Sequence, residues 1–184
     1  MGRTRSEASR RAILDAAIGE LREHGYPAVT VDGIAARAGA GKQTIYRWWG
    51  SKADVVLDAV LDLAESVIAL PDEGTLEADV EAFLVATFRQ RDQRPALAGL
   101  MAQSVLDPEF ATPFRKRFLF RRRAALRTVF ERGRARGEIA PDIDTELLID
   151  VVFGVLWYRL LVEHAPLSED AGRELAALVL RAVR

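Results

Sequence analysis

The sequence predicts an all-α fold of about nine helices, three small ones followed by about six longer ones. Apolar residues recur at the three- and four-residue spacing of a helix along most of the chain, and no stretch alternates apolar and polar residues long enough for a strand. Glycine, proline and capping residues interrupt this pattern where separate helices would start and stop. With 184 residues the chain can hold one sizeable core, or a small module joined to a larger one.

The first two helices have clear boundary signals. Residues 6–24 carry one apolar face, with Ser6 as the N-cap and Gly25 as the stop. Thr30 is a good N-cap for a short helix over residues 31–38. The sequence therefore predicts a long helix followed by a short one.

A glycine-containing turn separates this helix from a second short helix. Residues 39–41 form the turn, and the helix runs from Lys42 to Trp48 or Trp49. Ile45 and Trp49 fall on one side of it. The polar residues left free to face outward are Lys42, Gln43, Thr44 and Arg47.

The later helices follow the same rules. Ser51 with Asp54 resembles a capping box, and Thr75, Asp144 and Ser168 are further N-cap candidates. The expected helices cover residues 51–70, 75–91, 95–106, 114–136, 144–162 and 168–184. A linker at 71–74 separates the first two of these helices, and Asp107-Pro108 and Thr112-Pro113 mark additional helix starts.

Composition narrows the function classes. There is no cysteine, which excludes disulfides, thiolate metal sites and cysteine nucleophiles. The two histidines, His24 and His164, lie in no metal-ligand spacing and beside no nucleophile signature. We therefore expect no enzyme, no cofactor and no metal. The start of the chain lacks a signal peptide and no apolar run is long enough for a membrane span, so a cytoplasmic protein with no membrane partner is expected.

Charge is unevenly distributed along the chain. The net charge is −1, but residues 1–52 carry roughly +4 and the remainder roughly −5. Electrostatic attraction acts locally, within a Debye length of about 10 Å. The basic N-terminal part is therefore the candidate for contact with a polyanion.

Two short helices joined by a glycine-bearing turn and preceded by a longer helix form the plan of a helix-turn-helix, whose second short helix lies in the DNA major groove. Residues 30–52, Thr-Val-Asp-Gly-Ile-Ala-Ala-Arg-Ala-Gly-Ala-Gly-Lys-Gln-Thr-Ile-Tyr-Arg-Trp-Trp-Gly-Ser-Lys, resemble the signature of the tetracycline-repressor (TetR, AcrR-like) family. The resemblance covers about residues 8–57, and residues 136–161 resemble C-terminal domains of some members more distantly. It implies a helix-turn-helix DNA-binding domain over 1–52 and a helical ligand-binding and dimerisation domain over 53–184.

The resemblance assigns DNA contacts to residues of the motif. Lys42 and Gln43 match positions that read base edges, where lysine favours guanine and glutamine favours adenine. Lys52 adds its charge to a helix start that attracts phosphate, and Arg47 can reach a base or a phosphate. The full predicted DNA-binding set is Thr30, Lys42, Gln43, Thr44, Tyr46, Arg47, Trp48 and Lys52. Two departures from the common pattern are Gly41, where a capping serine or threonine is frequent, and the tandem Trp48-Trp49.

The last two helices are candidates for a homodimer contact. The helix at 144–162 has too wide an apolar face for one side of a monomer's core, so a second copy is expected to cover part of it together with the helix at 168–184. The alternative is that this surface closes a monomeric core. A dimer would place two reading helices about 34 Å or more apart, to suit a palindromic operator.

The middle helices carry aromatic and polar residues at helical spacing. They are predicted to line a mostly apolar pocket for an unidentified small-molecule effector, or else to form solid core. These residues are Phe83, Thr87, Phe88, Leu100, Met101, Ser104, Phe110, Phe114, Phe118, Trp157 and Tyr158. The arginines and lysine of residues 115–123 are interpreted as a solvated face with salt bridges in preference to the entrance for an acidic ligand.

By resemblance, the function predicted is that of a repressor that leaves its operator when a small molecule binds. The alternative is a helical ligand-binding or scaffold dimer without sequence-specific DNA binding.

Overall fold

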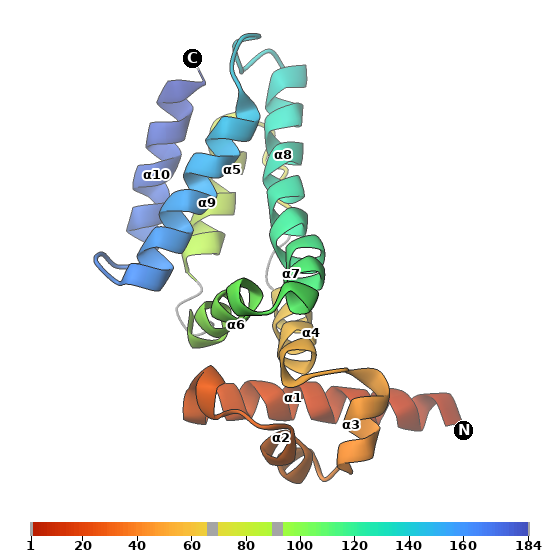
Figure 1. The fold of residues 1–184 in the computed structure, drawn as a ribbon. Helices are drawn as coiled ribbons and strands as arrows, with labels where there is room; N and C mark the ends of the chain where they lie inside the picture. Colours follow the sequence, from red (N-terminus) through yellow and green to blue (C-terminus); the bar gives the residue numbers. More distant parts are fainter. Residues whose placement is uncertain (1, 66–69, 90–93, 184) are drawn as a thin grey trace. The chain divides into compact units, whose positions relative to one another are not determined.

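The computed structural model describes residues 2–65, 70–89 and 94–183, with backbone alone for 2–6 and 64–65 (Figure 1). Every regular element in these ranges is a helix, which confirms the all-α prediction. The helices are α1 (Gly2–Ala28), α2 (Val31–Ala38), α3 (Lys42–Trp48), α4 (Lys52–Glu65), α5 (Leu76–Phe88), α6 (Arg94–Leu106), α7 (Pro108–Phe114), α8 (Phe120–Ala135), α9 (Thr145–Val162) and α10 (Glu169–Ala182).

Packing divides these helices into two compact units. The first unit contains α1 to α4, α6 and α7, and the second contains α5, α8, α9 and α10. Because α6 and α7 pack with α1 and α4, these units do not follow the expected division after residue 52. The functional division into residues 1–52 and 53–184 stays a prediction.

All of the predicted N-caps except Ser6 are formed as expected. The side chains of Thr30, Thr75 and Ser168 each accept a hydrogen bond from the backbone N–H three residues on, at 3.0, 3.2 and 3.2 Å. Asp144 accepts from the N–H groups of the second and third following residues at 2.9 and 3.2 Å. The Ser51 hydroxyl accepts from the Asp54 N–H at 3.2 Å. These bonds satisfy N–H groups that a helix start leaves without intrahelical partners.

Three helix boundaries differ from the prediction. The first helix begins at Gly2 instead of Ser6, since the intervening arginines and threonine can continue a helix at little cost, and it is interrupted at Gly25, whose φ is 70°. Helix α5 ends at Phe88, whereas its predicted end at Arg91 lies outside the described residues. The predicted end of the preceding helix at Leu70 directly follows residues outside the described ranges.

The third difference is at Thr112-Pro113, which does not start a helix. Pro113 lies inside α7, whose N-cap is Asp107, and the backbone continues into α8 through a π-helical turn at Arg115–Leu119. Proline supplies no N–H to the helical ladder, and the wider turn follows directly after it.

The core of the first unit joins α1, α2, α3 and α4. Its fully buried side chains include Ile13 and Leu14 of α1, Ile34 of α2 and Ile45 of α3. In the second unit α5 packs against both α10 and α8, and α9 packs against α8. A Cβ added to Gly172 of α10 would lie 2.9 Å from the Leu84 carbonyl oxygen, so only glycine allows these two backbones to approach so closely.

Candidate nucleic-acid interface

Helix α3 is fixed from its buried side. Ile45 is fully buried, and Trp49, the C-cap residue, is 5% exposed. The Trp49 indole Nε1–H donates to the Asp58 carboxylate on α4 at 2.9 Å. These two anchors set which face of α3 is turned outward.

The outward face carries the polar residues that the sequence analysis singled out. Lys42, Gln43, Tyr46 and Arg47 are exposed, and because they follow three- and four-residue spacing they share one face of the helix. Thr44 and Trp48 are half-buried beside them. The predicted DNA-binding residues of this helix therefore lie together on a single surface. Helix α3 contributes nitrogen donors to this surface and no acidic side chain.

The two short helices are tied together by an exposed ion pair. The Lys42 ammonium contacts the Asp32 carboxylate at the start of α2, and both side chains are more than half exposed. An ion pair in this setting contributes about 0.2–1 kcal/mol and exchanges readily for another anion. Lys42 is therefore positioned by a weak ion pair with Asp32 and can exchange this carboxylate for another anion.

Aromatic side chains meet at the end of α3. The Trp48 and Trp49 rings are in edge-to-face contact, with centroids 5.5 Å apart, and the Arg47 guanidinium lies 5.4 Å from the Trp48 ring centroid. The two adjacent tryptophans therefore have different roles. Trp49 anchors the helix, and the ring of Trp48 contacts the Arg47 guanidinium.

Lys52 is the first residue of α4, close to where the sequence predicted a helix start, and it has a partner that the sequence did not indicate. Its ammonium donates to the Tyr26 carbonyl oxygen at 3.2 Å and lies 4.7 Å from the Tyr26 ring centroid, and burial lowers the pKa of Lys52. A cation over an aromatic ring is attracted by the ring quadrupole. Lys52 is thus held against the end of α1.

Tyr26 is a neighbour of Lys52 that the sequence analysis did not single out. It is 6% exposed, its hydroxyl has no hydrogen-bond partner among the described residues, and burial, with the charges of Asp54 and Asp107, raises the pKa of Tyr26 to about 12. A Cβ added to Gly99 of α6 would lie 2.3 Å from the Tyr26 ring, so this ring fills the space between α1 and α6. Within the first unit, Tyr26 links α6 to Lys52.

Arginine 37 holds α2 against α1. Its guanidinium donates to Glu23 at 2.6 Å and lies 3.5 Å from the Glu20 carboxylate. The hydrogen bond from Arg37 lowers the pKa of Glu23. Thr30, predicted to contact DNA, is exposed at the start of the same helix, where its hydroxyl oxygen caps the Gly33 N–H.

The predicted effector-pocket residues fall in both units. In the second unit Phe83, Thr87, Phe88 and Phe118 are buried, and Trp157 is half-buried. Tyr158 differs from the prediction, being 58% exposed with its ring 4.4 Å from the His164 ring. Leu156 and Leu160 take the inner side of α9, and the helical rotation of about 100° per residue turns Tyr158 outward.

In the first unit the other predicted pocket residues lie on α6 and α7. Leu100, Phe110 and Phe114 are buried, whereas Met101 and Ser104 are half-buried. The Phe110 and Phe114 rings stack with centroids 5.9 Å apart. These side chains serve as core of the first unit, and their part in binding a ligand stays a prediction.

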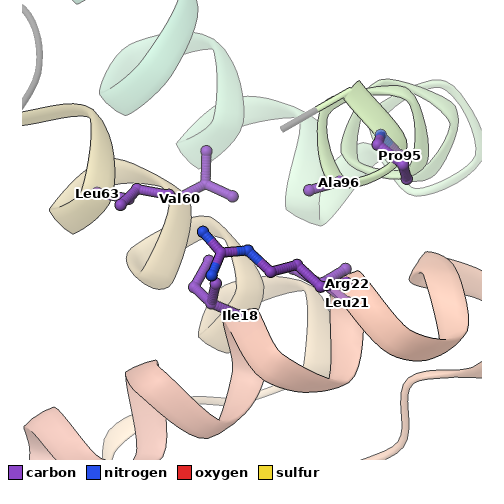
Figure 2. A pocket seen from close by; sticks show the side chains of 7 residues that line it. All are labelled: Ile18, Leu21, Arg22, Val60, Leu63, Pro95 and Ala96. Atoms are coloured by element: carbon purple, nitrogen blue, oxygen red, sulfur yellow. The ribbon is translucent and has the colours of Figure 1, made fainter. Parts of the chain in front are cut away.

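A small hollow lies elsewhere in the first unit, where α1, α4 and α6 meet (Figure 2). Its lining residues are Ile18, Leu21, Arg22, Val60, Leu63, Pro95 and Ala96. Its cavity volume of about 20 Å³ is enough for a water molecule and far below the roughly 300 Å³ of a ligand pocket. The hollow is therefore a packing defect at a helix junction and no effector site.

The second unit presents an apolar surface on α9 and α10, here called the α9–α10 face. Its large exposed side chains include Leu147, Val151, Tyr158, Leu161 and Leu178. Other apolar residues of the same helices, such as Val152 and Val179, are buried against the rest of the unit. The wide apolar pattern that the sequence shows in these two helices therefore has two parts, one buried in the core of the unit and one exposed on its surface.

Within the described ranges, no cluster of three or more His, Asp or Glu side chains is arranged to hold a metal ion. None of the helices in these ranges has the length and apolarity needed to cross a bilayer.

A three-helix module that fixes one short helix from behind and exposes its polar face defines a helix-turn-helix DNA-binding protein. The family model described as bacterial regulatory proteins, tetR family, matches residues 13–59, and the one described as tetracyclin repressor-like, C-terminal domain, matches residues 70–179. The chain belongs to the TetR family of transcriptional regulators.

Relatives and solved structures agree with this assignment. The chain is 35% identical to the uncharacterised HTH-type transcriptional regulator YdeS of Bacillus subtilis, over 100% of this chain and 93% of that protein. It is 29% identical to the DNA-binding transcriptional repressor TetR of Mycobacteroides abscessus, over 85% and 84%. The crystal structure of the TetR family transcription regulator SCO0332 has a TM-score of 0.79 and 29% identity, with 96% and 98% of the two chains covered.

Proposed function

We propose that this regulator is a repressor that binds a palindromic operator as a homodimer and leaves it when a small molecule binds to the second unit. The observation that carries the proposal is the presentation of α3, which is buried through Ile45 and Trp49 and exposes Lys42, Gln43 and Arg47. A short helix held in this way can enter a major groove without losing its own support.

Residue roles follow from position on the interface. Lys42 and Gln43, at the N-terminal end of α3, are proposed to read base edges, and Lys42 exchanges Asp32 for DNA when it does so. Thr30, Thr44, Tyr46 and Trp48 are proposed to position the phosphate backbone, and Arg47 to reach a base or a phosphate. Lys52, held by Tyr26, is proposed to present a fixed positive charge to phosphate.

Dimer formation is supported by the α9–α10 face. Isolated exposed apolar residues are common on monomers, but here Leu147, Val151, Tyr158 and Leu161 recur along one helix and Leu178 lies on the next. A second copy covering the same face by two-fold symmetry would form a four-helix contact. Such a dimer would carry two reading helices, one for each half of the operator.

Release by an effector requires that the small molecule bind the conformation with low DNA affinity more tightly than the other. The buried aromatic and polar residues of the second unit, Phe83, Thr87, Phe88 and Phe118, are proposed to contribute to the effector site.

The test begins with selection of bound duplexes from a random DNA library by the full chain, followed by fluorescence anisotropy on the selected sequence. Lys42→Ala with Gln43→Ala is expected to weaken selected-site binding by about 10- to 100-fold and to relax sequence preference. Lys52→Ala is expected to weaken all sequences alike and to reduce the salt dependence by about one phosphate contact.

Lys116→Ala is the matched control, because it removes the same charge from an exposed position outside the helix-turn-helix. Failure to enrich any sequence, or equal loss with the control, would favour the alternative of a helical ligand-binding dimer without specific DNA recognition.

A further inference from the structure

Most arginines that follow the π-helical turn have a strong acceptor. Arg123 and Arg127 pair with Glu146, Arg136 pairs with Asp79, and Arg132 and Arg134 donate to backbone carbonyls at 3.0 and 2.8 Å. Of these arginines only Arg123 belongs to residues 115–123, and its pairs with Glu146 and Asp150 fit the salt bridges expected there. Five cations of this helix and its C-terminal end are therefore accounted for by groups of the chain itself.

Arg122 differs from them. Its guanidinium donates to the Thr87 hydroxyl on α5 at 3.4 Å and lies 5.7 Å from the Phe118 ring centroid. No carboxylate of the described residues lies within ion-pair distance of it. One long hydrogen bond to a neutral hydroxyl leaves most of the five N–H donors of the guanidinium without an acceptor among the described residues.

The surroundings of this guanidinium destabilise its charged form. Burial lowers the pKa of Arg122 to about 10, which still leaves it protonated at neutral pH. A cation removed from water without a counter-ion destabilises the fold, and such a group is commonly retained because a ligand completes it.

The surroundings of Arg122 indicate the chemistry of that ligand. Thr87 is 3% exposed and Phe118 is 3% exposed, and Phe83 lies one turn before Thr87 on the same face of α5. A guanidinium fork matches a planar carboxylate, and the Thr87 hydroxyl can donate to a carboxylate oxygen. A single positive charge balances one negative charge, while the aromatic neighbours favour an apolar body.

We propose that Arg122 and Thr87 form the anion-binding part of the effector site, and that the effector is a monocarboxylic acid with an apolar body. This inference depends on the proposed function in one respect, namely that the bound acid controls operator affinity. Acid binding itself is a separate property of the second unit and is measured separately.

The experiment uses isothermal titration calorimetry on the full chain with octanoate, decanoate, benzoate and phenylacetate, each compared with its neutral amide. At least one acid is expected to bind, with its amide at least about 10-fold weaker, since the charge-assisted hydrogen bonds are lost. Arg122→Met is expected to weaken the acid by about 10-fold or more, and Arg122→Lys, which keeps the charge without the fork, by less.

Arg123→Gln is the control, because it removes the neighbouring charge that Glu146 and Asp150 already balance, and the acid should bind it within about twofold of the parent. Absence of binding by all four acids, equal binding of acid and amide, or unchanged affinity in Arg122→Met would each overturn the proposal.

Thermal unfolding provides a measurement independent of the acid chosen. Arg122→Met should unfold at the same or a higher temperature than the parent, since it removes a half-buried charge that no carboxylate of the described residues balances. A markedly lower temperature would assign Arg122 to the core and overturn the proposal. Addition of the acid to the operator complex then tests the coupling: an acid that binds through Arg122 but leaves operator affinity unchanged supports the anion site and contradicts effector control.

Discussion

Helix α3 and helix α9 each hide one side and expose the other, but the exposed sides differ in kind. On α3 the exposed side carries Lys42, Gln43 and Arg47, whereas on α9 it carries Leu147, Val151 and Leu161. Polar donors in water have little to gain from an apolar partner, and exposed apolar area gains most from one. The comparison teaches that the same amphipathic design leaves a polar surface on one helix and an apolar surface on the other, which suit the polyanion and the protein partner proposed for them.

The largest expected effect comes from placing a charge on the α9–α10 face. In a two-fold dimer Val151→Glu would bury two glutamates without partners, which is expected to weaken dimerisation by about 100-fold or more. Analytical ultracentrifugation measures the dimer dissociation constant. Ala135→Glu, at an exposed position on α8, is the control. An unchanged dimer in Val151→Glu would show that this face has another use.

A smaller effect is expected at the support of Lys52. Tyr26→Phe removes a buried hydroxyl that has no hydrogen-bond partner in the described part of the chain, so the free energy of unfolding should rise by up to about 1 kcal/mol. Tyr26→Leu removes the ring as well and should lower both stability and DNA affinity, because the ammonium loses its aromatic contact. Chemical denaturation and anisotropy measure the two quantities. Lower stability in Tyr26→Phe would imply a partner for the hydroxyl in solution.

The exposed ion pair between α2 and α3 offers a finer test of the polar surface. Asp32→Asn removes a carboxylate that competes with phosphate for Lys42, so affinity for non-operator DNA should rise by about two- to fivefold at low salt. The gain should fade as salt is raised, which a titration series in potassium chloride would detect. A gain that persists at high salt would contradict the electrostatic origin.

The smallest effect is expected at the start of α3. Gly41 is the N-cap, provides no side-chain hydrogen bond and has open space around it, with φ at −76°. Gly41→Ser can add a capping bond without strain and should stabilise the chain by a few tenths of a kcal/mol. Amide hydrogen exchange in α3 is the sensitive measurement. Faster exchange in the variant would show that the glycine is needed for the turn.

Features governed by neighbours in sequence were predicted well. Thr30, Thr75, Asp144 and Ser168 were identified as caps because each bond spans only two or three residues. Thr112-Pro113 misled because a proline signals a boundary, whereas here a π-helical turn lets the backbone continue beyond it.

Features governed by distant partners were missed. Lys52 meets Tyr26 across 26 residues, and Arg122 meets Thr87 across 35. Sequence showed that residues 115–123 are basic, but it could not show which of these cations would find a carboxylate. For Tyr158, the breadth of the apolar pattern on α9 hid which residues face inward.

The close approach at Gly172 has a mechanical consequence. Because no side chain cushions α10 from the α5 backbone, the two helices can only shift as a single body, with little room for one to yield alone. In the proposed dimer, where α10 lies at the contact, a displacement of α5 would therefore be passed on to the partner subunit. Gly172→Ala would push the two helices apart, and it is expected to weaken this coupling even if the proposed dimer still forms.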